Sequence, residues 1–200
     1  MRKITLKDGL GVDIQISAGD YAIDCGANIG DVTDLFQSLG AHVIAFEPNE
    51  HAFKVLNKRF QNNARVVCIQ KGVSGKNDCG TRKMFLHEKA EENQLTYSTG
   101  CSLLEDKNNV NRENFIHAEV IDFCSFLNSF DVSVKVLKID IEGAEVNLMN
   151  DLLDEGLLRE IPYVFVETHE RKIPSLVEST QKLKQRIKKE NYHNINLDWR

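Results

Sequence analysis

The sequence predicts an α/β fold in which a mostly parallel β-sheet carries helices on both faces. Short apolar segments of strand length alternate along the chain with stretches whose apolar residues recur at helical spacing. The strand segments are apolar on both faces, as is typical of strands inside a parallel sheet. With 200 residues, of which 42% are hydrophobic, the chain is long enough to bury one core, and we expect a single domain over residues 1–200.

A β-hairpin is expected at the start of the chain, within residues 1–19. Apolar and polar residues alternate on either side of a turn at Lys7-Asp8-Gly9. Strands and helices then alternate, and Gly40 ends the first helix. The expected strands lie at 21–23, 42–46 and 65–69, and the expected helices contain residues 32–39 and 52–60.

The segment from 72 to 114 interrupts this alternation. It is rich in Gly, Asn, Lys, Glu and Ser, and only residues 84–86 have strand character. Loops of this length inside a compact domain usually serve a function. We therefore expect residues 72–114 to form a loop region on the substrate side of a site.

Strands and helices alternate again after this segment. The expected strands lie at 115–121, 134–139 and 163–166, and the expected helices begin after Asp122, near residue 146 and near Ser175. Around residues 193–197 the pattern is that of a short final edge strand. The basic residues of the last helix are interpreted as a solvated face, with Leu183 and Ile187 turned inward.

Composition and charge argue against several classes of protein. Lys and Arg number 25 against 30 Asp and Glu, and this net charge of −5 argues against a surface built for nucleic acid. No stretch has the length and apolar character of a membrane span or a signal peptide, so we expect neither. The five cysteines contain no Cys-x-x-Cys pair, so a zinc knuckle is not expected. Their odd number and scattered spacing, without a secretion signal, fit a reducing, cytoplasmic setting. Whether the chain forms a homo-oligomer is left open.

Ligands of parallel sheets bind beyond the carboxyl ends of the strands, where the strand order reverses. After the first parallel strand, the run DCGANIG from Asp24 to Gly30 leads directly into a helix. Gly26 and Gly30 allow a tight turn and a close approach of the backbone to a ligand. The run is not the dinucleotide-binding fingerprint, which has a glycine where Asn28 stands. A plain strand-to-helix turn is the alternative interpretation.

Glu47 follows the second parallel strand, about 20 residues after Asp24. A carboxylate at this place can accept hydrogen bonds from both ribose hydroxyls of a nucleoside. The alternative is an acid near a helix N-terminus, stabilised by the helix dipole. Its combination with the preceding glycine-containing run favours the nucleoside.

Further acidic residues gather after two later strands. They are Asp140, Glu142 and Glu145 after one strand, and Glu167, with His169, after the next. Buried carboxylates are costly unless they are paired, hydrated or used in chemistry. Histidine titrates near neutral pH, so His169 is a candidate general base. The alternative for Glu145 is an ordinary place in the first turn of a helix.

The strings IDCGANIGDVT, AFEPN, VLKIDIEGAE and VFVETH, in this order and spacing, resemble the FkbM family of S-adenosylmethionine-dependent methyltransferases. The resemblance covers about residues 21–169. It implies a Rossmann-like class I methyltransferase fold and methyl transfer, typically to a hydroxyl group on a sugar, a glycan or a natural product. The cofactor residues that it implies are Asp24, Gly26, Asn28 and Gly30 for the methionine part, Glu47 for the ribose, and Pro48 and Asn49 for the adenine. The acceptor-side residues that it implies are Asp140, Glu142 and His169.

The resemblance also leaves alternatives open. The family fold closes with two antiparallel strands, whereas few residues follow Glu190 here, so we expect that strand pair to be truncated. His169, Asp140 or Glu142 is the expected base for the acceptor hydroxyl. A divalent cation held by Asp140, Glu167 and His169 is an alternative that we do not favour, because spacing alone does not distinguish it from a base. A non-catalytic module of the same fold, serving assembly or regulation, is another.

Overall fold

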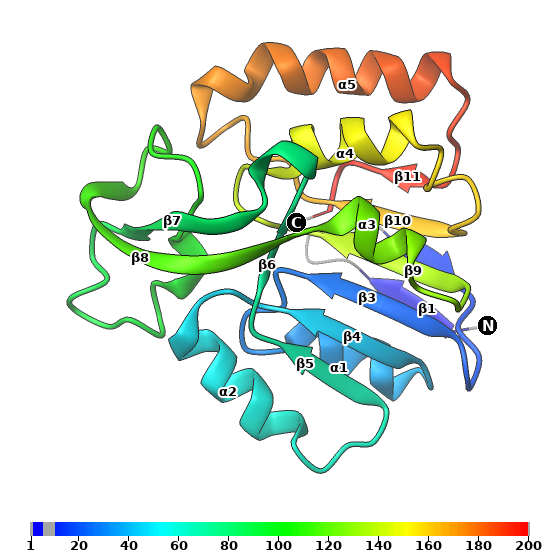
Figure 1. Ribbon diagram of the computed structural model, residues 1–200. Coiled ribbons are helices and arrows are strands. Elements are labelled where there is room, and N and C mark those ends of the chain that lie inside the picture. The colour runs from blue at the N-terminus through cyan, green and yellow to red at the C-terminus, as the bar shows by residue number, and fades with distance from the viewer. Residues whose placement is uncertain (1, 6–10, 200) are drawn as a thin grey trace.

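The computed structural model describes residues 2–5 and 11–199 (Figure 1). Within these residues the central sheet has six strands, which pair in the order β11-β10-β9-β3-β4-β5, and every pairing is parallel. The strands are β3 (Tyr21–Cys25), β4 (His42–Phe46), β5 (Val66–Ile69), β9 (Val134–Ile139), β10 (Tyr163–Val166) and β11 (Ile195–Asn196). The α/β fold with a parallel sheet is confirmed, and β4, β9 and β10 have the bounds that the sequence predicts.

The strand order reverses between β3 and β9, which lie side by side in the middle of the sheet. β4 and β5 continue the sheet beyond β3, and β10 and β11 continue it beyond β9 (Figure 1). The loops that follow β3 and β9 therefore leave the same edge together, and the backbone N–H of Asp140 donates to the carbonyl of Cys25 at 3.0 Å. This edge is where ligands of parallel sheets bind.

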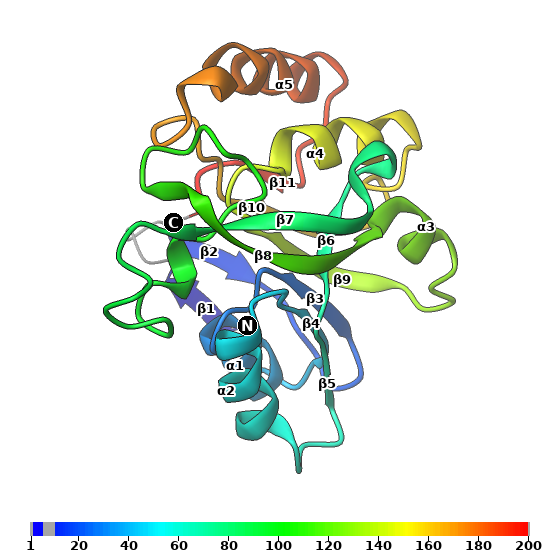
Figure 2. The ribbon, with the colours of Figure 1, turned by 60° about the vertical axis from the view of Figure 1, so that its left-hand side comes forward.

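Helices cover both faces of the sheet, because successive strand residues point to opposite faces. The helices are α1 (Asp31–Ser38), α2 (Glu50–Phe60), α3 (Phe123–Asn128), α4 (Glu145–Asp154) and α5 (Val177–Lys189). Ile23 and Leu137 belong to the core on the face of α3, α4 and α5. Ala22 belongs to the core on the opposite face, with Phe36 of α1. In Figures 1 and 2, α4 and α5 lie next to the half of the sheet that contains β10 and β11. The helices α1 and α2 lie next to the half that contains β4 and β5.

The expectation of a loop over 72–114 with one short strand at 84–86 is wrong. A smaller sheet with the order β6-β8-β7 is built from β6 (Gly72–Ser74), β7 (Gly80–His87) and β8 (Val110–Asp122), with short 3₁₀ turns at Lys76–Asp78 and Ser98–Gly100. Residues 80–83 of β7 are exposed, so this part of the strand has no apolar pattern that the sequence could reveal. Figure 2 shows β7 and β8 crossing in front of the central sheet.

The predictions for the two ends of the chain can be compared with the structure to different extents. β1 (Arg2–Thr5) pairs antiparallel with β2 (Gly11–Ile14), but the predicted turn at Lys7–Gly9 lies outside the described residues. At the other end, β11 has two residues and pairs parallel with β10. The described residues therefore close the sheet with one short parallel strand. None of the helices described is both long and apolar enough to cross a membrane.

Candidate functional site

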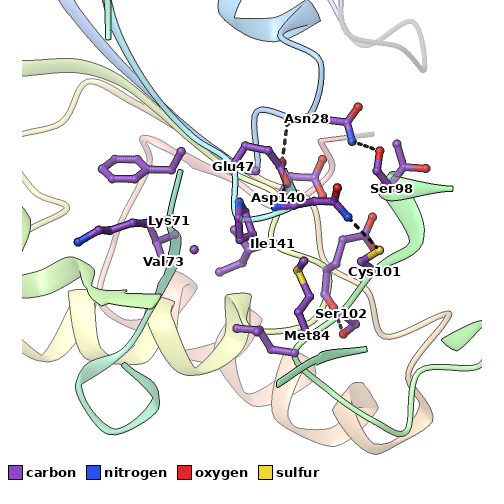
Figure 3. A pocket seen from close by; sticks show the side chains of 18 of the residues that line it. Asn28, Glu47, Lys71, Val73, Met84, Ser98, Cys101, Ser102, Asp140 and Ile141 are labelled. Carbon is purple, nitrogen blue, oxygen red and sulfur yellow. Dashed lines mark hydrogen bonds between the residues drawn. The ribbon is translucent and has the colours of Figure 1, made fainter. Parts of the chain in front are cut away.

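A cavity of about 340 Å³ lies at the carboxyl ends of β3, β4, β9 and β10 (Figure 3). Its volume falls in the range of small-molecule sites. Several residues singled out by the sequence line it, namely Gly26, Asn28, Glu47, Pro48, Asn49, Asp140 and Glu142, and so does Glu167. The parallel topology thus brings together side chains that are more than a hundred residues apart in the chain.

Glu47 is buried in the wall of the cavity, where both carboxylate oxygens accept backbone hydrogen bonds. Oε2 accepts from the N–H of Asn28 at 2.9 Å (Figure 3). Oε1 accepts from the N–H of Asn49 at 2.7 Å. Burial raises the pKa of Glu47 to about 7, although these two hydrogen bonds act in the opposite direction. The capping residue of α2 is Asn49, whose Oδ1 accepts from the N–H groups of His51 and Ala52. Glu47 is therefore fixed in the loop before the helix.

Gly26 and Gly30 both have positive φ angles, of 79° and 93°. A Cβ on Gly26 would lie 1.8 Å from the carbonyl oxygen of Asp140, and one on Gly30 would lie 2.6 Å from the ring of Phe60. Both glycines are thus required by the packing of the protein against itself. The positive φ angles fit the tight turn expected from the sequence, and Gly26 borders the cavity. The close approach of this backbone to a ligand stays a prediction.

Asp24 is completely buried and does not line the cavity. Its Oδ2 accepts from the hydroxyl of Thr33 at 2.7 Å, and its Oδ1 lies 3.2 Å from Nζ of Lys138. Lys138 also donates to the carbonyl of Gly26 at 2.7 Å. Burial lowers the pKa of Lys138, but the charges of Asp24 and Asp140 outweigh burial and raise it. Asp24 and Lys138 together hold the loop after β3 against β9.

His169 lies behind the cavity wall and is buried. Its Nδ1 is hydrogen-bonded to Oε1 of Glu145 at 2.9 Å. Its Nε2 lies 3.1 Å from Oε2 of Glu142, 3.7 Å from Oε1 of Glu167 and 3.8 Å from Oδ1 of Asp140. Burial lowers the pKa of His169, but the carboxylates of Glu142 and Glu145 beside its two nitrogens outweigh burial and raise it to about 10. The imidazole thus carries a proton at neutral pH.

Glu145 lies in the first turn of α4, as the alternative interpretation has it, but it is completely buried. Its carboxylate accepts from the backbone N–H groups of Ile141 and Gly143, at 2.9 and 3.1 Å for Oε1. Those bonds fix the loop after β9, and the remaining contact of the carboxylate is with His169. Glu145 therefore sets the position of His169 as well as beginning a helix.

The sequence does not single out Lys107, whose side chain is completely buried at this site. Its Nζ donates to Oε2 of Glu142 at 2.6 Å and to the carbonyl of Gly100 at 2.8 Å. Burial raises the pKa of Glu142, but His169 and Lys107 outweigh burial and lower it to about 2. Lys107 comes from the segment between β7 and β8, where spacing gives no signal for it.

Two serines from the same segment also reach the site. The Oγ of Ser98 accepts from Nδ2 of Asn28 at 2.9 Å, and the Oγ of Ser102 donates to the carbonyl of Glu142 at 2.5 Å (Figure 3). Both serines are buried and line the cavity. These contacts join the segment between β7 and β8 to the loops after β3 and β9. The segment thus forms one wall of the cavity.

The charge of the cavity wall is negative. Among the residues that line it, the carboxylates are Glu47, Asp140, Glu142 and Glu167, and the cations are Lys71 and Lys172. An excess of carboxylates in a partly enclosed space attracts a positively charged ligand. The arrangement can therefore bind a ligand that combines hydroxyl groups near Glu47 with a positive charge.

Comparison with known proteins gives one match. A family model described as the methyltransferase FkbM domain matches residues 24–193. This match covers most of the chain, from the end of β3 to the segment before β11. No curated protein and no solved structure matches the chain.

Proposed function

This chain belongs to the FkbM family of methyltransferases, and from that premise we propose that it methylates a hydroxyl group of a sugar, a glycan or another natural product. Membership of the family implies that the methyl donor is S-adenosylmethionine. The observation that carries the proposal is the buried carboxylate of Glu47 in the wall of a cavity at the reversal of strand order. A carboxylate at this place can accept hydrogen bonds from both hydroxyls of a ribose.

The residues present fit the adenosyl donor. Each carboxylate oxygen of Glu47 accepts one backbone N–H and keeps a further lone pair for a ribose hydroxyl. Pro48 and Asn49 border the same part of the cavity and would contact the adenine. Gly26 and Asn28 would border the methionine part, with Asp24 and Gly30 supporting their loop from behind. The negative wall suits the positive sulfur of the donor.

Asp140, Glu142 and His169 form the acceptor side in this proposal. Asp140 and Glu142 line the cavity, and His169 fixes both from behind. S-adenosylmethionine supplies a methyl group on a positively charged sulfur, which a hydroxyl oxygen can attack in line. The residues of the acceptor side would hold that oxygen within about 3–3.5 Å of the methyl group. A carboxylate of the acceptor side would also take its proton as the new bond forms, because His169 is already protonated at neutral pH.

The donor site is tested by isothermal titration calorimetry with S-adenosylhomocysteine. The wild-type chain is expected to bind it with one-to-one stoichiometry. Glu47→Gln removes the charge that strengthens two hydrogen bonds, and its affinity is expected to fall by about 10-fold or more. Glu91→Gln, at an exposed acid that does not line the cavity, is the control and keeps wild-type affinity. Absence of binding at millimolar concentration would instead favour the non-catalytic module.

The acceptor class is tested by transfer of a labelled methyl group to a panel of simple glycosides. Label in the sugar that survives mild alkali identifies a methyl ether, the product of hydroxyl methylation. Label that alkali releases as methanol identifies an ester and contradicts the hydroxyl acceptor. Asp140→Asn is expected to lower turnover while leaving the affinity for S-adenosylhomocysteine close to that of the wild type.

A further inference from the structure

The imidazole of His169 is surrounded by carboxylates. Its side chain is 1% exposed, and the acids within 4 Å of its two nitrogens are Asp140, Glu142, Glu145 and Glu167. The two nitrogens differ in their bonding. Nδ1 is hydrogen-bonded to Glu145, whereas the buried Nε2 makes no well-aligned hydrogen bond among the described residues, although Oε2 of Glu142 lies 3.1 Å away. An unpartnered buried nitrogen that faces acids on several sides is costly unless a further group occupies the place.

The atoms around Nε2 have the spacing of a cation site. Oxygens of Glu142, Glu167 and Asp140 lie 3.1, 3.7 and 3.8 Å from Nε2. Ligands around a small octahedral ion are about 3 Å from their neighbours, since each lies about 2.1 Å from the ion. Ligand atoms of Asp140, Glu145 and His169 also lie within 4.8 Å of one another. Small rotations of partly exposed carboxylates would complete such a site.

The bonding of Nδ1 supports this interpretation. Histidines that bind metals through one nitrogen almost always donate the other N–H to a carboxylate or a carbonyl, which fixes the ring and its tautomer. Glu145 receives that bond here, and its own carboxylate is fixed by the N–H groups of Ile141 and Gly143. Once the ring has lost its second proton, the proton that stays on Nδ1 faces Glu145, and the lone pair of Nε2 is directed toward the acids. The ring is therefore held in the orientation that a metal requires.

The local excess of carboxylates over lysines also favours the binding of a cation. Lys107 pairs with Glu142, and Lys138 lies 3.5 Å from Asp140 but also pairs with Asp24. The carboxylates near His169 therefore exceed the lysines that reach them. A divalent ion would supply the missing positive charge. On binding, the ion takes the lone pair of Nε2, and the proton that the ring carried leaves to solvent.

We propose that this place binds one divalent transition-metal ion, with Nε2 of His169 and carboxylate oxygens of Asp140, Glu142 and Glu167 as ligands. A mixture of one imidazole with carboxylates favours Zn²⁺ or Mn²⁺ over Mg²⁺ and Ca²⁺, which prefer oxygen alone. Two of the carboxylate ligands belong to the acceptor side of the proposed function, so the ion would also be placed to bind an acceptor hydroxyl. The metal site itself does not depend on that function.

The test is titration of the chelator-treated, full-length chain with Zn²⁺ by calorimetry and with Mn²⁺ by electron paramagnetic resonance. One ion per chain is expected, with release of a proton that measurements in two buffers of different ionisation enthalpy detect. Glu167→Gln removes one ligand from a partly exposed position and is expected to weaken binding by about 10-fold or more. His169→Gln is expected to abolish binding, and its circular dichroism spectrum reports whether it is folded. Glu91→Gln is the matched control and binds like the wild type.

Four outcomes are informative. Failure of Zn²⁺ and Mn²⁺ to bind at 1:1 stoichiometry, or equal binding by the wild type and Glu167→Gln, would overturn the metal site. Binding of Mg²⁺ as tightly as Zn²⁺ would overturn the role of His169. Because S-adenosylhomocysteine binding is measured separately, a chain that binds the metal without the nucleoside contradicts the proposed function and leaves the metal site standing.

Discussion

At the scale of single residues, the ionisation of Glu47 links donor binding to pH. Its pKa is raised to about 7 by burial, so near neutral pH a part of the molecules carries a protonated Glu47. Ribose hydroxyls donate hydrogen bonds, and a carboxylate accepts them better than a carboxylic acid does. Donor binding should therefore favour the deprotonated form and release a proton.

We expect the affinity for S-adenosylhomocysteine to rise with pH across the range around pH 7. Between pH 8 and pH 6 the affinity should fall by about 10-fold, because each unit below the pKa costs one factor of ten in the deprotonated fraction. Calorimetry at a series of pH values measures this dependence. The Glu47→Gln variant has no ionisable group at this position, so its affinity should not change with pH over this range. A wild-type affinity that is constant between pH 6 and pH 8 would contradict the role of Glu47 as a ribose acceptor.

Gly26 gives a second prediction at this scale, because its lack of a Cβ is required by a neighbouring strand end. A methyl group there would lie 1.8 Å from the carbonyl oxygen of Asp140, in a backbone conformation with a φ of 79°. Gly26→Ala is therefore expected to lower the free energy of unfolding by about 3 kcal/mol, from steric clash and backbone strain together.

Gly80 provides the matched control, since its φ is 93° and no described atom lies within 4 Å of where its Cβ would be. Gly80→Ala should cost only backbone strain, about 1 kcal/mol. Urea unfolding of the two variants compares these costs. Equal losses would mean that the contact between Gly26 and Asp140 has no energetic weight.

At the scale of elements, the sequence predicts the strands of the central sheet better than the segment between β7 and β8, which forms one wall of the cavity. β4, β9 and β10 are buried and apolar, so their patterns are unambiguous. β7 is exposed at its start and has no such pattern. The buried ends of Lys107 and Ser98 depend on contacts with loops far away in the chain, and no local spacing rule can predict those contacts.

The pair of Lys107 and Glu142 tests how this segment is held. Lys107→Met leaves the partly buried carboxylate of Glu142 without its lysine, and we expect a loss of about 3 kcal/mol in the free energy of unfolding. The double variant Lys107→Met with Glu142→Gln removes both charges and should recover part of that loss. Lys54→Met, which breaks an exposed pair with Glu50, should cause no measurable change. If the double variant is less stable than Lys107→Met alone, the charge pair is not the cause.

At the scale of the whole molecule, one topological feature assembles the site. The parallel pairing of β3 with β9 sets Asp24 opposite Lys138, and the loops after these strands carry Gly26 and Asp140. The sequence predicts which strand ends carry polar residues, because each follows an apolar run. No local pattern in the sequence encodes the order of the strands in the sheet. The contacts between residues from the two halves of the chain are therefore seen only in the folded structure.

The C-terminal segment offers a test of whether the whole molecule unfolds as one unit. Trp199 is 7% exposed, and its ring lies 5.2 Å from that of Phe165, in the core that includes Phe36 of α1. The chain has a single tryptophan, so its fluorescence reports only on this segment. We expect the fluorescence and the far-ultraviolet circular dichroism to give the same urea transition, as two-state unfolding requires. Trp199→Ala should lower the free energy of unfolding by about 3 kcal/mol, while Val177→Ala, at an exposed position, should cost far less. A fluorescence transition at a lower urea concentration than the circular dichroism transition would mean that the C-terminal segment detaches before the sheet unfolds. The core on the side of α1 would then be stable without this segment.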